Sequence, residues 1–292
     1  IGLTLLGLFG LFEYKHEAKG HTPLVSLGLF KNKQFTAGAI TTAMMALGQT
    51  GLIFSIPIFY QSVLGLDAFH TGLGLLPMSL AIMIGAPTSL RLTKRLLPKQ
   101  LIQLGFIISA IGTAYLALTL HTGSTVWTLA PGLFTYGLGM GFGFSQLGNL
   151  TLSAVSVEQS GEASGVNNTL RQVGGSFGSA LIGAALIATL SSSVVKKLNA
   201  SPVIPAASKA KIVSGVKDAG SNIEFQAPSG NSKLPATIQA EITKTTHEAT
   251  VEGNKVALAF TGGFALLALA FSTLLPSIRD LETGDKPTAS AH

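Results

Sequence analysis

The stretch GEASGVNNTLRQVGGSFGSA (Gly161–Ala180) passes from polar to apolar residues without a break. Arg171 stands at the junction, and three glycines follow it at positions 174, 175 and 178. Because glycine has no Cβ, these positions leave one face of a helix almost bare. We interpret the stretch as a polar loop that enters an apolar helix at Gln172, and the rest of the chain is read from this junction.

The composition on both sides of this junction is typical of a membrane protein. The 292-residue chain is 47% hydrophobic and only 11% charged, whereas soluble domains carry about 25% charged residues. A membrane-spanning helix needs about 20 apolar residues to cross roughly 30 Å of hydrocarbon. Six runs near that length contain no Asp, Glu, Lys, Arg or His: Thr36–Phe59, Thr71–Leu90, Leu101–Leu120, Val126–Gly148, Gln172–Leu190 and Val256–Leu275. We therefore predict an all-α integral membrane protein.

Residues 1–12 form a seventh apolar run, which is too short to span a bilayer. Because the chain opens on Ile1, we expect residues 1–12 to be the end of a truncated transmembrane helix. There is no cysteine, so disulfide and thiolate chemistry is excluded. We attribute the net charge of +6 to basic loops beside the membrane and expect no nucleic-acid partner.

The distribution of Lys and Arg predicts which loops face the cytoplasm. The gaps at 13–35 and 91–99 each carry four basic residues, and the gaps at 60–70 and 121–125 carry none. Short basic loops stay on the cytoplasmic side. We therefore predict a cytoplasmic loop at 13–35, five transmembrane helices within 36–190, a last one at 256–276, and a cytoplasmic tail at 277–292.

The gap at 191–255 should then lie outside, although it is rich in lysine. Loops longer than about 60 residues translocate largely regardless of charge, so a long extracytoplasmic loop is consistent with the rule. Within it, residues 235–249 could form an amphipathic helix with Ile238 and Ile242 on one face. A disordered lysine-rich loop fits the composition equally well.

Glycine spacing within two of the spans indicates close helix packing. The sequence GLGMGFG (Gly137–Gly143) would need a preceding strand and a following acidic residue to act as a dinucleotide-binding loop, and it lies inside an apolar run instead. Small residues four apart let helix backbones approach closely in a membrane. We predict tight interfaces at two such pairs: Gly137 with Gly141, and Gly174 with Gly178.

No arrangement of side chains indicates an enzyme. The six histidines are scattered through loops and tails, without the spacing of metal ligands. No pair of carboxylates and no nucleophilic triad is present. We therefore predict no catalytic residue, no metal and no cofactor.

Uncharged polar and aromatic residues at membrane depth are the candidates for a binding cavity. Gln49 and Phe54 lie on the first full span, and Tyr136, Phe142 and Gln146 on the fourth. A buried amide in lipid must find a partner or line a wet cavity. We predict that the five form an adaptable apolar wall with a few polar anchors. The alternative is that they only hold helices together.

Three further residues are placed at the ends of the spans. Tyr60 and Gln61 follow the first full span, near the predicted outer mouth of the cavity. Arg171 stands at the cytoplasmic end of the fifth. A long basic side chain at such a place can extend to the membrane surface, or it can form a gate contact with another domain. Both interpretations are open.

Four pieces of the chain resemble a known family: PLVSLGLFKNKQFTAG (Pro23–Gly38), IPIFYQSVLG (Ile56–Gly65), TGLGLLP (Thr71–Pro77) and GEASGVNNTLRQVGGSFG (Gly161–Gly178). They are similar to the carboxy-terminal half of the fourteen-helix drug:proton antiporters of the major facilitator superfamily, the EmrB/QacA type. The resemblance runs from Pro23 to about Leu190. The last piece is its most specific part.

The resemblance implies a six-helix C-terminal bundle of a major facilitator fold, preceded by the end of one linker helix at 1–12. It places the first and fourth full spans on the central cavity, and the second and fifth against the other half. Arg91 and Arg95 then lie in the gating loop between the second and third helices, where Leu97 and Pro98 depart from the family pattern. The proton-coupling acids belong to the N-terminal half.

The sequence thus predicts a proton-driven exporter of lipophilic, cationic compounds in a bacterial cytoplasmic (inner) membrane. Its expected partners are membrane lipid, the N-terminal half of the same transporter and a small lipophilic substrate, with the proton gradient in place of a cofactor. Two alternatives are a major facilitator for one metabolite and a non-transporting membrane scaffold that uses residues 191–255 as a binding module.

Overall fold

The computed structural model describes residues 4, 7–8, 10–12, 27–202 and 235–275. Within them every regular element is a helix, which confirms the predicted fold class. The helices are η1 (Leu27–Lys31), α2 (Lys33–Ser62), α3 (Ala68–Gly74), α4 (Leu76–Leu92), α5 (Pro98–Thr119), α6 (Val126–Leu152), α7 (Ser160–Ala200) and α9 (Ala236–Ser272). The linker-helix prediction for 1–12 falls only partly on described residues. Predictions for 13–26, 203–234 and 276–292 lie outside them.

Five segments are long and apolar enough to cross a membrane: α2, α3 with α4, α5, α7 and α9. The sixth predicted span, α6, is not among these five in the described part of the chain. It contains six glycines, which add no apolar side chain. Its 27 residues still reach about 40 Å at 1.5 Å per residue, so it is long enough to cross.

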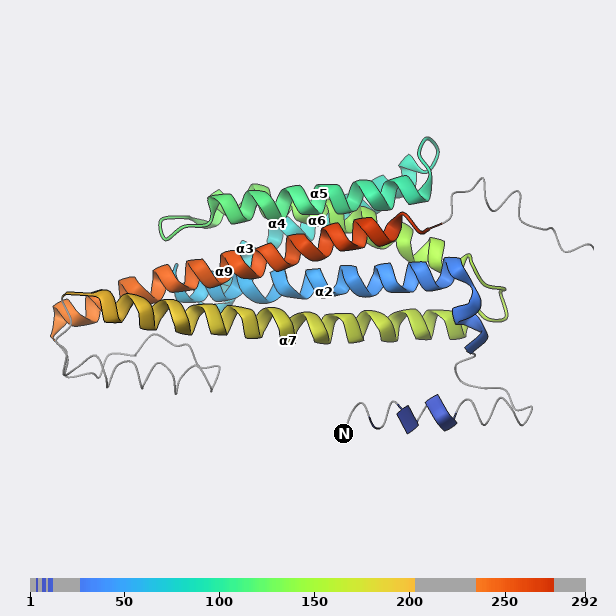
Figure 1. Cartoon of the computed structure of the whole chain (residues 1–292). Coiled ribbons are helices and arrows are strands. Elements are labelled where there is room, and N and C mark those ends of the chain that lie inside the picture. The colour runs from blue at the N-terminus through green and yellow to red at the C-terminus, as the bar shows by residue number, and fades with distance from the viewer. Residues whose placement is uncertain (1–3, 5–6, 9, 13–26, 203–234, 276–292) are drawn as a thin grey trace, which may run out of the picture.

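The long helices run along a common direction (Figure 1). In this view α5 and α9 lie on one side of α2, and α7 lies on the opposite side of α2. α2 packs against α6, α7 and α9, whereas α6 also packs against α4 and α5. α9 lies against α5 and α7 as well. α2 is therefore the central helix of the bundle, and a residue on it can meet three neighbours.

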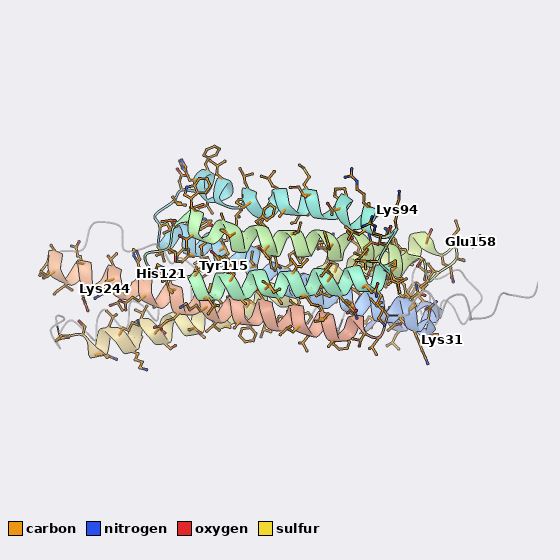
Figure 2. The ribbon with its side chains drawn as sticks, turned by 90° about the horizontal axis from the view of Figure 1, so that it is seen from above. Lys31, Lys94, Tyr115, His121, Glu158 and Lys244 are labelled. Carbon is orange, nitrogen blue, oxygen red and sulfur yellow. The ribbon has the colours of Figure 1, made fainter. Side chains whose placement is uncertain are left out.

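The two ends of the bundle differ in charge. Lys31, Lys94 and Glu158 lie at one end, and His121 and Lys244 lie at the other (Figure 2). The loops that the sequence identifies as basic therefore share one end, which we call the basic end. The prediction that this end faces the cytoplasm requires such an arrangement.

At the basic end, α2 is tied to the connection between α6 and α7. The Asn32 side chain caps α2 by accepting hydrogen bonds from the backbone N–H groups of Gln34 at 3.0 Å and Phe35 at 3.2 Å. Its amide also donates to the Ala154 carbonyl at 2.6 Å, and Gln34 donates to the Leu150 carbonyl at 2.8 Å. A cap satisfies N–H groups that the helix itself cannot pair. These contacts fix the start of α2 beside the end of α6.

Glycines set the closest helix contacts in the half of the bundle that contains α4, α5 and α6. Gly137 and Gly141 face the backbone of α4, and Gly139 faces α5 beside Gly105. A Cβ at any of them would collide with a neighbouring backbone atom. Close backbone approach of this kind gains dispersion contacts that larger residues would prevent.

The glycines of α7 pack inside the chain, which corrects one expectation. The resemblance placed the fifth span, which contains Gly174 and Gly178, against the other half of a transporter. Instead, a Cβ on Gly174 would collide with the backbone of Ala43, and one on Gly178 with that of Leu47, both on α2. The apolar face of α7 that a partner could use is therefore a different one.

Two helices extend beyond the predicted spans, into the polar stretch before Gln172 and into both ends of the segment 191–255. α7 has 41 residues and α9 has 37, so they reach about 60 Å and 55 Å at 1.5 Å per residue, nearly twice the hydrocarbon thickness of about 30 Å. The charged and polar residues that we assigned to loops continue these two helices. The helical alternative for 235–249 agrees with α9, which begins at Ala236.

Beyond the predicted spans, α7 and α9 continue side by side as a two-helix extension, which we call the stalk (residues 190–201 and 236–252; Figure 1). Its apolar seam joins Leu190, Val194 and Leu198 of α7 to Ile238, Ile242 and Ala249 of α9. The α7 members are four residues apart, which places them on one helix face.

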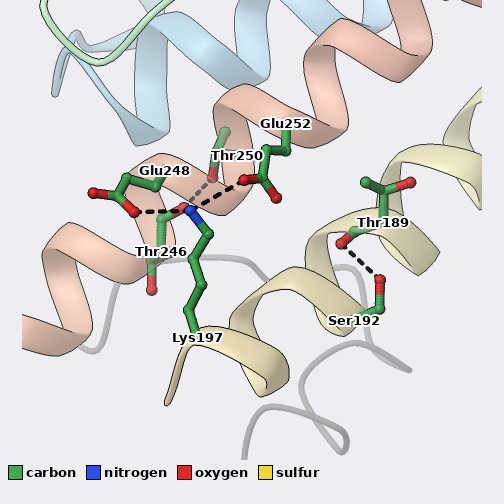
Figure 3. Close-up of polar contacts among 7 residues, drawn as sticks. All are labelled: Thr189, Ser192, Lys197, Thr246, Glu248, Thr250 and Glu252. Atoms are coloured by element: carbon green, nitrogen blue, oxygen red, sulfur yellow. Dashed lines mark hydrogen bonds and ion pairs between the residues drawn. The ribbon is translucent and has the colours of Figure 1, made fainter. Parts of the chain in front are cut away.

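Polar contacts complete the stalk at the end opposite the basic end. The Lys197 ammonium bonds to Glu248 at 2.8 Å and to Glu252 at 3.0 Å (Figure 3). The Ser201 hydroxyl donates to the Glu241 carboxylate at 2.9 Å. The stalk is thus a helical pair held by an apolar seam and by paired charges.

Candidate functional site

A cleft of about 350 Å³ lies between α2, α6 and α7. We call it the α7 cleft. It is lined by Thr42 and Met45 of α2, Phe144, Leu147 and Gly148 of α6, and Ser164, Gly165, Asn167, Asn168 and Arg171 of α7. Binding sites for small molecules have volumes of about 300 to 1,000 Å³, so the α7 cleft is large enough for a small ligand.

The α7 cleft has an apolar floor and a polar edge. Met45 and Leu147 belong to the main hydrophobic core, and Phe144 packs against it. The polar edge comes from α7. Gly148 and Gly165 leave the space open, since a Cβ on either would have nothing within 4 Å. The arrangement suits a ligand with an apolar body and a polar group.

Arg171 extends from α7 across this cleft. Its Nη2 donates to Asn168 Oδ1 at 3.2 Å, and its guanidinium carbon lies 5.8 Å from the centre of the Phe144 ring on α6. An arginine over an aromatic face is attracted by the negative electrostatic potential on the face of the ring. Arg171 lies well within α7, which starts at Ser160, and not at the start of a helix as the sequence suggested.

Two buried amide atoms near this region have no hydrogen-bond partner in the described part of the chain: Asn167 Oδ1 and Gln146 Nε2. A buried polar atom without a partner costs about 1 to 3 kcal/mol. Asn167 lines the α7 cleft. Its amide could present oxygen or, rotated by half a turn, nitrogen, so it can accept or donate to a ligand.

The five residues predicted to form one cavity wall are not brought together. Gln49 and Tyr136 border a separate interior space of about 10 Å³ between α2, α5, α6 and α9, roughly enough for one water molecule. Phe54 packs against a cluster on α7 and α9. Phe142 lies beside Gly105 of α5, and Gln146 is buried. None of the five is among the residues that line the α7 cleft.

The pair predicted at the outer mouth is also divided. Tyr60 is fully buried in the core, and its ring fills the place where a side chain on Gly74 would be. Gln61 is exposed. The burial of Tyr60 by α3 accounts for the difference, because no feature of the sequence predicted a short helix over the end of α2.

The two other predicted gate residues lie at the basic end. Arg91 is in the last turn of α4, and Arg95 is in the connection to α5. Both are exposed. The neighbouring Lys99 reaches from α5 to the end of α9, where its ammonium donates to the carbonyls of Thr273 at 2.7 Å and Leu275 at 2.6 Å. This connection therefore also supports the end of α9.

The polar edge of the α7 cleft was not predicted, because the polar residues before Gln172 were interpreted as a loop. Ser164, Asn168 and Arg171 are spaced by four and three residues, and such residues share a helix face. The sequence alone shows that spacing and could have predicted a helix there. What concealed it was the assumption that a helix in a membrane protein begins where the charged residues stop.

Comparison with known proteins places this architecture in a family. The family model described as Major Facilitator Superfamily matches residues 2–179, which is more than half of the chain. The chain belongs to the Major Facilitator Superfamily. Relatives in the superfamily match with modest identity over most of this chain.

The tetracenomycin C resistance and export protein of Streptomyces glaucescens is 25% identical over 87% of this chain and 46% of its own length. The multidrug efflux pump LfrA of Mycolicibacterium smegmatis is 29% identical over 63% of this chain and 36% of its own. The multidrug export protein EmrB of Escherichia coli is 28% identical over 61% of this chain and 35% of its own length. The chain thus spans between about a third and a half of the length of these relatives.

Membership in the superfamily confirms the predicted resemblance. The relatives are named as export proteins or efflux pumps, and the superfamily to which the chain belongs consists of transporters and not of enzymes. Together with the apolar helices, the match shows a multi-pass membrane protein.

Proposed function

We propose that the protein is a proton-coupled secondary transporter that exports lipophilic compounds across the cytoplasmic membrane by alternating access. The observation that carries this proposal is the α7 cleft, which is of ligand size and bordered by three different helices. In alternating access one helix bundle rocks against another around the binding site, so a cleft on this bundle would be covered and uncovered as the other half moves. The names of the relatives add support for efflux.

The proton-coupling groups would lie in another part of the transporter. The six charge-free runs contain no acidic residue, and a proton relay within a membrane uses groups that can be protonated. We propose that an N-terminal half supplies them. On this proposal the present bundle contributes substrate contacts and part of the gate.

Exposed apolar stripes mark where that half would pack. Val173, Phe177 and Leu181 are 38%, 63% and 46% exposed on α7, and they are four residues apart. Exposed residues of α4 include Leu80 and Met83. On a membrane-spanning helix such a stripe meets either lipid or another helix bundle, and we propose that these stripes meet the other half. Arg91 and Arg95 lie at the basic end, where we propose that they contact the other half as part of the cytoplasmic gate.

Dye efflux from a bacterial host that lacks its own pumps tests the proposal on the full-length protein. We expect energised cells to export a lipophilic dye and to stop when an uncoupler collapses the proton gradient. Phe144→Ala removes part of the cleft floor and should raise the KM for the dye severalfold. Trp127→Ala is the matched control, because Trp127 lies on the same helix, is 83% exposed and does not line the cleft.

Four results would contradict the proposal or part of it. Efflux that continues after the gradient collapses would exclude proton coupling. Uptake of one metabolite with no export of dyes would favour a facilitator. No transport by a well-expressed full-length protein would leave the scaffold interpretation. Equal effects of Phe144→Ala and Trp127→Ala would remove the α7 cleft from the substrate path.

A further inference from the structure

We infer that the α7 cleft selects lipophilic organic acids, with Arg171 as the side chain that binds the acidic group. This inference rests on the proposed function, since it names the substrate class of the same site. It differs from the lipophilic cations that the sequence led us to expect. The reason is the charge and hydrogen-bonding character of the lining residues.

Arg171 is the one charged residue among the described residues that line the cleft, and no lining residue is a carboxylate. The nearby acids Glu158 and Glu162 are not lining residues either. A cationic ligand in the cleft would therefore meet a like charge at close range, and an anion would meet an opposite charge. Because Arg171 is exposed, solvent weakens both interactions, but the sign of the preference stays the same.

The arginine is held in an orientation that suits this task. The contact with Asn168 uses Nη2, and the ring of Phe144 lies beneath the guanidinium. A guanidinium has five N–H donors in a planar fork that matches a carboxylate. The remaining donors can face a ligand without breaking the Asn168 contact. Pre-orientation of this kind reduces the entropy lost on binding.

Asn167 supplies a second polar contact on the same face of α7. Its Oδ1 is buried and unpartnered within the described residues, and Asn167 lines the cleft. When the amide is rotated, its NH₂ group takes the place of Oδ1 and can donate to a carboxylate oxygen of the ligand. A quaternary ammonium, which has no N–H donor and no acceptor, satisfies neither orientation of the amide.

The apolar floor accounts for the rest of the ligand. Met45, Phe144 and Leu147 form it, and methionine and aromatic side chains adapt to varied apolar shapes. The acid would therefore lie at the polar edge on α7, with its hydrocarbon or aromatic body against α2 and α6. This places charge recognition and shape recognition on different helices.

Three probes of one shape test the inference on the full-length protein: naphthoic acid, naphthamide and naphthylmethylamine. Competition with dye efflux gives an inhibitory concentration for each, and thermal shift of the purified protein gives binding without transport. Arg171→Gln should weaken naphthoic acid about tenfold in both assays, since a charged hydrogen bond is lost. Naphthamide should change by less than about twofold. Arg171→Lys, which keeps the charge, should retain most of the binding of the acid.

The outcomes separate the inference from the proposed function. If the wild-type protein exports nothing but naphthoic acid still stabilises it in an Arg171-dependent manner, the site stands and the transport proposal fails. If naphthoic acid stabilises the wild type no more than naphthamide does, the inference is overturned. If Arg171→Gln weakens all three probes equally, Arg171 serves a gate or an ion pair with the other half, which also overturns it.

Discussion

The two halves of α7 use their polar residues in different ways. In the half near the basic end, Asn167 has a buried oxygen without a partner among the described residues, and Arg171 bonds to a neutral amide. In the stalk half, Lys197 bonds to two carboxylates, and Ser201 bonds to a third. Polarity alone does not separate the halves. The halves differ in whether their polar groups are already paired within the described part of the chain.

Packing differs between the same two halves. Near the basic end, glycines of α7 pack directly against the backbone of α2. The other faces of α7 there can border the cleft and contact a partner. In the stalk α7 uses Val194 and Leu198 against α9. The first half is therefore built for close approach to one helix, and the second for a self-contained pair.

The largest expected effect comes from breaking the glycine contact. Gly178→Leu places a branched side chain where the backbone of Leu47 lies, so α7 must move away from α2. Overpacking costs typically about 1 to 3 kcal/mol, and here a rigid backbone is the obstacle. We expect the full-length protein to lose its monodisperse peak in size-exclusion chromatography, or to melt at least several degrees lower.

Gly161→Ala is the matched control on the same helix, because a Cβ there would meet nothing within 4 Å. It should leave the melting temperature unchanged, or raise it slightly through better helix propensity. If Gly178→Leu melted like the wild type, α7 would not be seated on α2 as described, and the walls of the α7 cleft would be placed wrongly.

The sequence predicts the membrane helices well because a charge-free run of about 20 apolar residues is rare outside a membrane-spanning helix. The glycine pairs were also predictable as contact points. The sequence did not predict which helix each glycine pair contacts. Gly174 and Gly178 fit a partner outside the chain as well as they fit α2, and only the three-dimensional arrangement decides between them.

The candidate site was harder to predict than the fold. Gln49, Phe54 and Gln146 were grouped because they are polar or aromatic at membrane depth, and the helix rotations then separated them. The residues that do line the α7 cleft include Ser164 and Asn168, which lie where the sequence shows a polar stretch. A search for helical spacing across 160–171 would have found them, whereas the identity of the opposing wall depends on how α6 and α2 are rotated.

A second prediction isolates the stalk. Leu198 is fully buried in the apolar seam. Leu198→Asp would place a negative charge among these apolar side chains. We expect the stalk helices to separate while the bundle stays folded. Spin labels on Ser192→Cys and Thr243→Cys, both exposed positions, should then report a longer and broader distance. The described chain has no cysteine of its own to interfere.

Lys196→Asp is the control for this variant, since Lys196 lies two residues from Leu198 on a different, exposed face of the same helix. It should leave the label distance unchanged. If Leu198→Asp also lowered the melting temperature of the whole protein as strongly as Gly178→Leu, the stalk would be part of the bundle and the division of α7 into two halves would fail.

The smallest expected effect concerns the paired charges of the stalk and their response to pH. A hydrogen bond from Ser193 and then the contact with Lys197 lower the pKa of Glu252, against the opposing effect of burial. A hydrogen bond with Glu248 raises the pKa of Lys197, with a further contribution from Glu252. Both groups lie outside the predicted spans. Pairing of the ionised forms is therefore the stable state near neutral pH.

The signs define the pH window. A carboxyl group with a lowered folded pKa stabilises the fold above its usual value of about 4.3, and this contribution is lost as the pH falls through the lowered value. The lysine contribution is complete below about 10.4 and is lost as the pH rises through the raised value. We expect the label distance to stay constant between about pH 5 and 9, and to lengthen in stronger acid or in base above about pH 10.4.

Ser193→Ala and Lys197→Met should each shift the acid transition of the stalk toward the usual range. The Ser193 hydrogen bond is the largest single cause that lowers the pKa of Glu252, and Lys197 lowers it through both a hydrogen bond and its charge. Lys196→Met serves as the control, since Lys196 makes the smallest contribution to the lowered pKa of Glu252. A change in label distance near pH 7 would contradict the view that the stalk charges are structural. It would make the stalk a pH-sensitive element, and the contrast between the paired and the unpaired half of α7 would then no longer distinguish structure from function.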